Sequence, residues 1–141
     1  MSANIKVSKV TDAATLNQVY AIRTEVFIKE QACPPEEEWE FEEESTHFLA
    51  TVDGEPAGAA RWRKTDNGYK LERFSVLKPQ RGKGVAQALV KAVLEDLPAD
   101  ADYIYLNAQV QAMPLYEKFG FEKTGPMFDE VGIDHYKMVK H

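Results

Sequence analysis

The chain has little of what marks secreted, membrane or metal-binding proteins. It contains one cysteine, Cys33, so no intrachain disulfide is expected, and such sparing use of cysteine is typical of a reducing cytoplasm. No apolar run approaches the roughly 20 residues that a membrane helix needs, and the first residues lack the pattern of a secretory signal. One cysteine and three histidines show no ligand spacing. We therefore expect a cytoplasmic protein with no metal and no membrane partner.

Positive charge is also scarce. The 17 lysines and arginines are outnumbered by 23 aspartates and glutamates, which gives a net charge of −6. Because proteins that neutralise phosphate backbones usually carry the opposite sign, nucleic acid is not an expected partner. The length fits a single domain over residues 1–141, and 44% hydrophobic residues are enough for one core.

Hydrophobic periodicity predicts alternating strands and helices. A first helix follows the capping residues Thr11 and Asp12 and ends near Gln31. The other expected helices span 85–97 and 114–120, and the expected strands span 5–10, 47–52, 57–64, 69–76, 103–106, 121–123 and 136–139. This order, β-α-β-β-β-α-β-α-β-β, predicts an α/β or α+β fold with a mixed sheet and helices on its faces.

An acidic segment follows the first helix. Seven glutamates lie between Glu36 and Glu44, and Trp39 and Phe41 interrupt them. Such a charge run is often disordered. The two aromatic residues favour a loop or short helix pinned to the body of the protein.

The strongest local signal is a glycine-rich stretch between the fourth strand and the second long helix. It consists of Arg81, Gly82, Lys83, Gly84, Val85 and Ala86. Small residues let an anion approach the backbone, and the free N–H groups of the first helical turn then point at it. The pattern is neither a Walker nor a Rossmann motif. The alternative is a plain glycine turn with solvated basic residues.

Two motifs in the chain resemble the signatures of the GNAT acetyltransferase superfamily. Arg81-x-x-Gly84-x-Ala86 is similar to R/Q-x-x-G-x-G/A, and 115–121 is similar to L-Y-x-x-x-G-F. The resemblance implies a mostly antiparallel sheet whose fourth and fifth strands splay, and acetyl-CoA as co-substrate. It also implies a small-molecule amine acceptor that attacks directly in a ternary complex. A homodimer is left open.

Further segments resemble the ElaA- and YjcF-type acyltransferases within that superfamily. They are 23–31, 44–47, 60–63, 106–109 and 132–138, so the resemblance covers nearly the whole chain. It does not identify the acceptor.

The resemblance also implies catalytic residues. Tyr116 would protonate the departing thiolate, with a plain core tyrosine as the alternative. Glu72 would be the base, with a salt bridge to Arg61 or Arg73 as the alternative. Because Glu72 lies four residues before Val76, we expect both side chains on one face of the strand. Besides the loop, the expected cofactor contacts are Phe74, Val76, Asn107 and Tyr116, and a bulge in the fourth strand would free a backbone N–H to stabilise the oxyanion.

Arg23 is unusual for its place, because it lies on the apolar stripe of the first helix. A charge there needs a partner. That partner is either a carboxylate from the acidic segment or an acceptor beneath a segment that folds over from Glu30 to His47. The expected acceptor-site residues are Arg23, Glu30, His47, Arg61, Gln109 and His135.

Two rival functions are left open. A non-catalytic acyl-CoA sensor would keep the glycine-rich loop but not need Tyr116 and Glu72. An acyl-homoserine lactone synthase shares the fold and some features of the first helix. Such synthases are usually longer and use an acyl carrier protein, which counts against that alternative.

Overall fold

The computed structural model describes residues 4–31, 45–130 and 132–140. The strands are β1 (Ile5–Lys9), β2 (Ser45–Val52), β3 (Glu55–Lys64), β4 (Tyr69–Val76), β5 (Ile104–Gln109), β6 (Phe121–Glu130) and β7 (Ile133–Lys140). The helices are α1 (Ala13–Arg23), the π-helix η1 (Thr24–Glu30), the 3₁₀ turns η2 (Lys78–Gln80) and η3 (Val110–Ala112), α3 (Val85–Asp96) and α4 (Met113–Glu117). The predicted order is confirmed, and the acidic segment lies outside the described residues.

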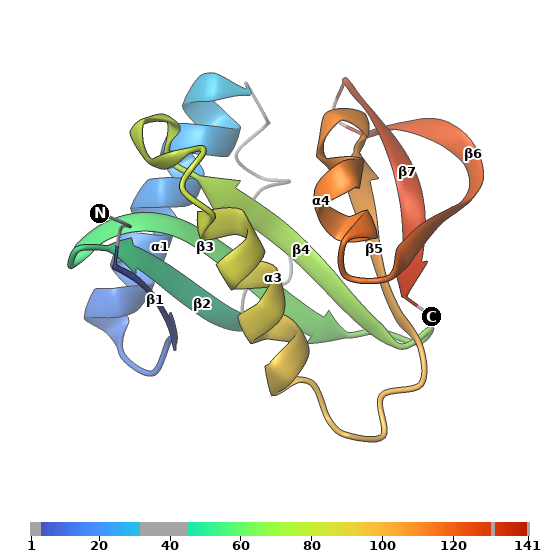
Figure 1. Ribbon diagram of the computed structural model, residues 1–141, viewed down its shortest axis with the longest axis horizontal. Helices are drawn as coiled ribbons and strands as arrows, with labels where there is room; N and C mark the ends of the chain where they lie inside the picture. Colours follow the sequence, from blue (N-terminus) through green and yellow to red (C-terminus); the bar gives the residue numbers. More distant parts are fainter. Residues whose placement is uncertain (1–3, 32–44, 131, 141) are drawn as a thin grey trace.

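The strands form one seven-stranded sheet in the order β1-β2-β3-β4-β5-β7-β6. Every neighbouring pair is antiparallel except β4 and β5, which run parallel. These two strands pair at three positions only, the last being Leu71 with Leu106. Beyond it the backbones of the two strands diverge in a V (Figure 1). We call this splay between the β4 and β5 backbones the opening. The predicted mixed sheet with a splay between the fourth and fifth strands is confirmed.

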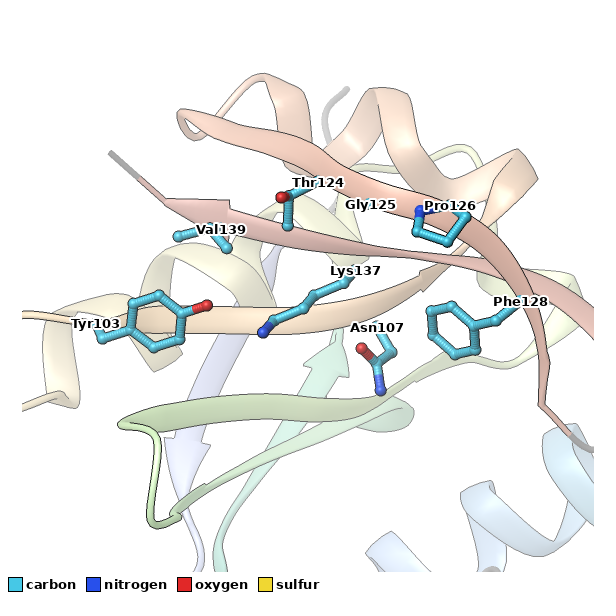
Figure 2. Close-up of a pocket in the computed structure, with 8 residues that line it drawn as sticks. All are labelled: Tyr103, Asn107, Thr124, Gly125, Pro126, Phe128, Lys137 and Val139. Atoms are coloured by element: carbon cyan, nitrogen blue, oxygen red, sulfur yellow. The ribbon is translucent and has the colours of Figure 1, made fainter.

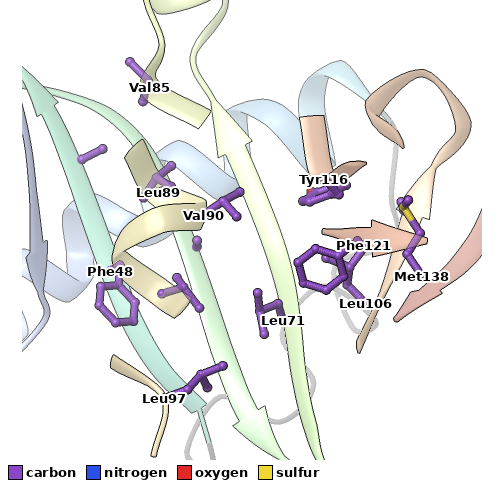
Figure 3. Packing of buried hydrophobic residues seen from close by; sticks show 14 of the residues in the cluster. Phe48, Leu71, Val85, Leu89, Val90, Leu97, Leu106, Tyr116, Phe121 and Met138 are labelled. Atoms are coloured by element: carbon purple, nitrogen blue, oxygen red, sulfur yellow. The ribbon is translucent and has the colours of Figure 1, made fainter. Parts of the chain in front are cut away.

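Helices cover both faces of the sheet, with α3 in front and α1 behind in Figure 1. Neighbouring residues of β2 divide between these faces: Phe48 packs in the core under α3, and Leu49 packs under α1. The larger core lies on the α3 face (Figure 3). In the described ranges, no helix is long and apolar enough to cross a membrane.

Gly58 shows how closely α3 packs on the sheet. A Cβ atom at this position of β3 would lie 2.7 Å from the carbonyl oxygen of Ser75 and 3.0 Å from Cγ1 of Val85. Both distances are shorter than ordinary contacts, so only glycine allows this approach. The first turn of α3 is therefore held firmly against β3 and β4.

The last two strands are longer than the sequence predicted. β6 continues through Gly125 and Pro126, where its ladder with β7 is irregular between Thr124 and Phe128. β6 is also an edge strand, where proline costs no ladder hydrogen bond on the open side. The first helix changes at Thr24 from α to π geometry, and the Gln31 N–H donates to Val26 O at 3.0 Å.

Candidate functional site

The glycine-rich loop forms an open turn at the start of α3. Gly82 and Gly84 have φ values of +81° and +91°, which side chains rarely adopt. Gly84 caps α3 without any side-chain hydrogen bond, so the first-turn N–H groups are not satisfied by a capping side chain. The Val85 side chain is buried in the core and leaves only its backbone for a ligand. This geometry suits an anion at the helix N-terminus.

Arg81 joins this loop to the first helix. Its two terminal nitrogens bind both carboxylate oxygens of Glu30, at 2.9 and 2.8 Å, and its Nε donates to Val76 O at 3.0 Å. These hydrogen bonds hold the pKa of Glu30 below its ordinary value. The structure therefore places Glu30, an expected acceptor residue, at the glycine-rich loop.

The residue after Glu30 reaches the other side of the opening. Nε2 of Gln109, at the end of β5, donates to Oε1 of Gln31 at 3.0 Å. Consecutive residues at the end of η1 thus contact the region after β4 and the end of β5. This contact also places Gln109, an expected acceptor residue, at the mouth of the opening.

A bulge in β4 shapes the edge of the opening. Arg73 and Phe74 together lie opposite Ala60 of β3, and Arg73 has a φ of +59°. The extra residue shifts the alternation of side chains. Glu72 therefore points to the α1 face and Val76 to the α3 face. Our expectation that these two side chains share one face was wrong, because it assumed an unbroken strand.

The same bulge leaves backbone available at the opening. From Glu72 to Val76, β4 has no ladder partner in β5. Phe74, which an unbroken strand would put on the side of Glu72, instead packs edge-on against Tyr116, with ring centroids 5.7 Å apart. The side chain of Phe74, an expected cofactor contact, thus lies on the same face of β4 as the candidate acid Tyr116.

Tyr116 lies in α4 with 6% of its surface exposed. Its ring also packs edge-on against Phe121, at 6.2 Å. Burial raises the pKa of Tyr116 above its ordinary value, so the hydroxyl keeps its proton at neutral pH. The ring packs in the core, as expected for a purely structural tyrosine. The phenol also carries the proton that a general acid needs.

Glu72 lies in a cluster of positive charges on the α1 face. One of its carboxylate oxygens contacts Arg61 at 2.9 Å and Arg63 at 2.7 Å, and the other lies 3.4 Å from Nζ of Lys70. Burial by itself would raise the pKa of Glu72, but the three cations outweigh it and lower that pKa to about 2. Such a carboxylate stays ionised at neutral pH and accepts a proton poorly. The sequence left open whether Glu72 is a base or a salt-bridge partner. The geometry favours the salt bridge.

The remaining expected acceptor residues lie in two places. Arg23 is 1% exposed and its guanidinium is 5.9 Å from the centroid of the Tyr20 ring. His47 lies beside Arg61 in the β2–β3 ladder. His135 lies beside Gln109 in the β5–β7 ladder, and its Nδ1 donates to Ile133 O at 2.7 Å. Across the described residues, no three His, Cys, Asp or Glu side chains are grouped to hold a metal ion.

A groove on the far half of the sheet was not predicted from the sequence (Figure 2). It measures about 590 Å³, and its lining includes Tyr103 and Asn107 of the β5 region, Thr124, Pro126 and Phe128 of β6, and Lys137 of β7. The available sequence signal was the alternation of β7, which puts His135, Lys137 and Val139 on one face. Only Asn107 among the lining residues was an expected site residue.

Known proteins are similar to this chain over nearly its whole length. Residues 9–141 match a family model described as an acetyltransferase (GNAT) domain. The uncharacterized N-acetyltransferase YjcF of Bacillus subtilis (strain 168) is 46% identical over 129 residues, covering 89% of this chain and 91% of YjcF. YyaT of the same organism, an uncharacterized protein, is 31% identical over 141 residues, covering 96% of this chain and 95% of its own.

Two solved structures share the fold. Escherichia coli ElaA has a TM-score of 0.81 and 24% identity, with 99% of both chains covered. An acyl-CoA N-acyltransferase from Pseudomonas aeruginosa has a TM-score of 0.83 and 24% identity, with 99% of this chain and 100% of the other covered. At this identity the likeness shows the fold alone.

Proposed function

Because the chain belongs to the GNAT acetyltransferase family, we propose that it transfers an acetyl group from acetyl-CoA to the amine of a small molecule. The acceptor attacks directly in a ternary complex. One observation carries the proposal: the β4–β5 ladder ends at Leu71 and Leu106, and Tyr116 packs against Phe74 beside the strand edge that this leaves unpaired.

The loop before α3 fits the phosphates of acetyl-CoA. The first-turn N–H groups from Gly84 to Ala86 carry no capping side chain, and the helix dipole adds to their attraction for an anion. Arg81 uses three of its five N–H groups on Glu30 and Val76. Two remain for a phosphate oxygen, and Lys83 adds a second positive charge. Asn107, just past the last β4–β5 pair, would contact the cofactor near the acyl group.

The chain's own groups then serve the transfer. The thioester supplies the activated acyl group. The backbone N–H groups of β4 between Phe74 and Val76 would hold the carbonyl oxygen as negative charge develops on it. Tyr116 would hold a proton for the departing thiolate. Burial makes the phenol of Tyr116 a weaker acid than it would be in water. The same dry environment, however, raises the proton affinity of the departing thiolate.

The positive cluster around Glu72 leaves that residue a structural role. Its carboxylate balances Arg61, which has 0% exposure, and a carboxylate with a pKa of about 2 is a poor base for an ammonium group. We therefore assign Glu72 to the positioning of Arg61 and Arg63 on the α1 face. The acceptor then enters as the free amine, or loses its proton to water.

Thiol release from acetyl-CoA, measured with a panel of amines, tests the proposed function. We expect at least one amine to be acetylated, with initial-rate plots whose lines intersect because both substrates bind before reaction. Parallel lines would contradict the ternary complex. Acetyl-CoA that binds but is never consumed, whatever the amine, would contradict the enzyme and support the sensor.

A further inference from the structure

The groove of about 590 Å³ lies on the face of the sheet opposite α3 and α4. Leu106 and Ala108 of β5 pack on the side of those helices, so Asn107 points the other way, into the groove. Asn107 is also the first residue of β5 past the last pair with β4. The groove therefore meets the V-shaped opening at Asn107, from the side opposite the helix that carries Tyr116.

Lys137 gives the groove its charge. It pairs with Asn107 in the β5–β7 ladder, and its side chain extends along the groove toward Tyr103 (Figure 2). Its Nζ lies 5.4 Å from the centroid of the Tyr103 ring and 5.1 Å from that of Tyr105. Within the part of the chain that the structure describes, no carboxylate forms an ion pair with Lys137. Lys137 is the charged member of the lining.

The other end of the groove is apolar and built firmly. Phe128 stacks on the ring of His135, with centroids 5.8 Å apart and planes inclined by 24°. The irregular stretch of β6 between Thr124 and Phe128 places Pro126 beside it. Along the groove, Asn107 therefore lies between the cation of Lys137 and the ring of Phe128, as Figure 2 shows.

We propose that this groove binds the acyl acceptor, and that the acceptor is an amine with a carboxylate on an apolar or aromatic body, such as an apolar α-amino acid. This inference rests on the proposed function. One carboxylate balances the single charge of Lys137, and an apolar side chain packs on Phe128. The amine, attached between those two groups, lies at Asn107 where the groove meets the opening. A volume of about 590 Å³ is ordinary for a small-molecule site.

The first experiment compares two acceptors that differ only in the carboxylate. L-Phenylalanine and L-phenylalaninamide have the same ring and the same attacking nitrogen, but the amide lacks the negative charge. Because the amide is the weaker base, kcat/KM is expressed per concentration of unprotonated amine, and we expect this value to be at least tenfold higher for the acid. Equal rates, or a preference for the amide, would overturn the proposal.

The second experiment removes the charge from the groove. Lys137→Met keeps an unbranched side chain over the tyrosine rings, and we expect it to raise the KM for phenylalanine at least tenfold while the KM for phenylalaninamide and the Kd for acetyl-CoA stay unchanged. Lys137→Arg should restore most of the affinity. The matched control is Lys123→Met, because Lys123 lies 4.7 Å from the ring centroid of Tyr136, outside the groove. Equal effects at both lysines would overturn the proposal.

Calorimetry separates this proposal from the proposed function. Phenylalanine is titrated into the protein saturated with CoA, so binding is measured without turnover. Binding that Lys137→Met weakens supports the groove even if no thiol is released with any amine. Acetylation of other amines, with no binding of phenylalanine, would overturn the groove and leave the acetyltransferase in place. The thermal midpoint of each variant shows whether it is folded.

Discussion

The two faces of the sheet differ in chemistry. The α3 face is a continuous apolar core in which Leu71, Val90 and Phe121 pack with Tyr116 (Figure 3). The α1 face holds an ion cluster centred on Glu72 and, further along, the groove with Lys137. The α3 face offers a ligand backbone N–H groups and the phenol of Tyr116, which suit a cofactor shared by a whole family. The α1 face offers charges at fixed places, which can distinguish one acceptor from another.

The largest effect should come from breaking the ion cluster. Glu72→Gln leaves Arg61 buried without its carboxylate, and we expect a loss of about 3–5 kcal/mol in the free energy of unfolding. Urea denaturation measures it. The control is Glu25→Gln, which removes an exposed pair with Lys29 at 3.6 Å and should cost no more than about 0.5 kcal/mol. Similar losses in the two variants would show that the cluster is not a stabilising centre.

The same cluster predicts a dependence on pH. The pKa of Glu72 is lowered from 4.5 to about 2 on folding, so the unfolded chain takes up this proton first. Its contribution to stability is fully present above pH 4.5 and is lost as the pH falls toward 2. The stability difference between the parent and Glu72→Gln should therefore be constant near neutral pH and shrink below pH 4.5. A difference that grows on acidification would contradict the assignment.

The next effect concerns the α3 face. Tyr116→Phe keeps the ring between Phe74 and Phe121 but removes the acidic proton, so kcat should fall by about 10²-fold or more. Stability and the Kd for acetyl-CoA should change little. Tyr69→Phe is the matched control, because its ring also packs edge-on in the sheet, against Trp62, at the closed end of the opening. An unchanged kcat in Tyr116→Phe would leave this tyrosine a packing role alone.

A smaller effect should follow from a negative charge in the loop. Gly84→Asp should weaken CoA binding about tenfold, or 1.4 kcal/mol, because the carboxylate faces the phosphates. Gly84 has a φ of +91°, so any side chain also strains the backbone. Gly54→Asp controls for that strain, since Gly54 has a φ of +88° in the turn between β2 and β3. If both variants bind CoA alike in calorimetry, the loop is misassigned.

The smallest effect tests which side of the site Glu30 serves. Glu30→Gln loosens Arg81, and an exposed pair of this kind contributes up to about 1 kcal/mol. We expect the KM for acetyl-CoA to rise about two- to fivefold, while the KM for the acceptor stays the same. The reverse pattern in steady-state kinetics would return Glu30 to the acceptor site, as the sequence first indicated.

The sequence mostly predicted features that depend on residues close together in the chain. The glycine-rich loop and the Tyr116 segment are short motifs whose geometry depends on neighbouring residues, and hydrophobic periodicity predicted the element order. The resemblance implied a bulge in β4, but no residue such as glycine marks its position at Arg73, so the face of Glu72 was predicted wrongly. The Glu30–Arg81 pair and the groove at Lys137 depend on how distant segments meet, which no periodicity shows. The π-helical turn of η1, which ends at Glu30, was likewise hidden in an ordinary helical pattern.

The short seam between β4 and β5 also has a mechanical consequence. Three ladder positions join one half of the sheet, β1 to β4, to the other, β5 to β7. At about 3.3 Å per residue, Gln109 lies about 10 Å beyond the end of the seam at Leu106. A small rotation of one half of the sheet about these paired positions therefore produces a larger displacement at Gln109 than at Leu106. The hydrogen bond between Gln31 and Gln109 crosses the open end. At this distance from the paired positions, one hydrogen bond opposes such a rotation most effectively.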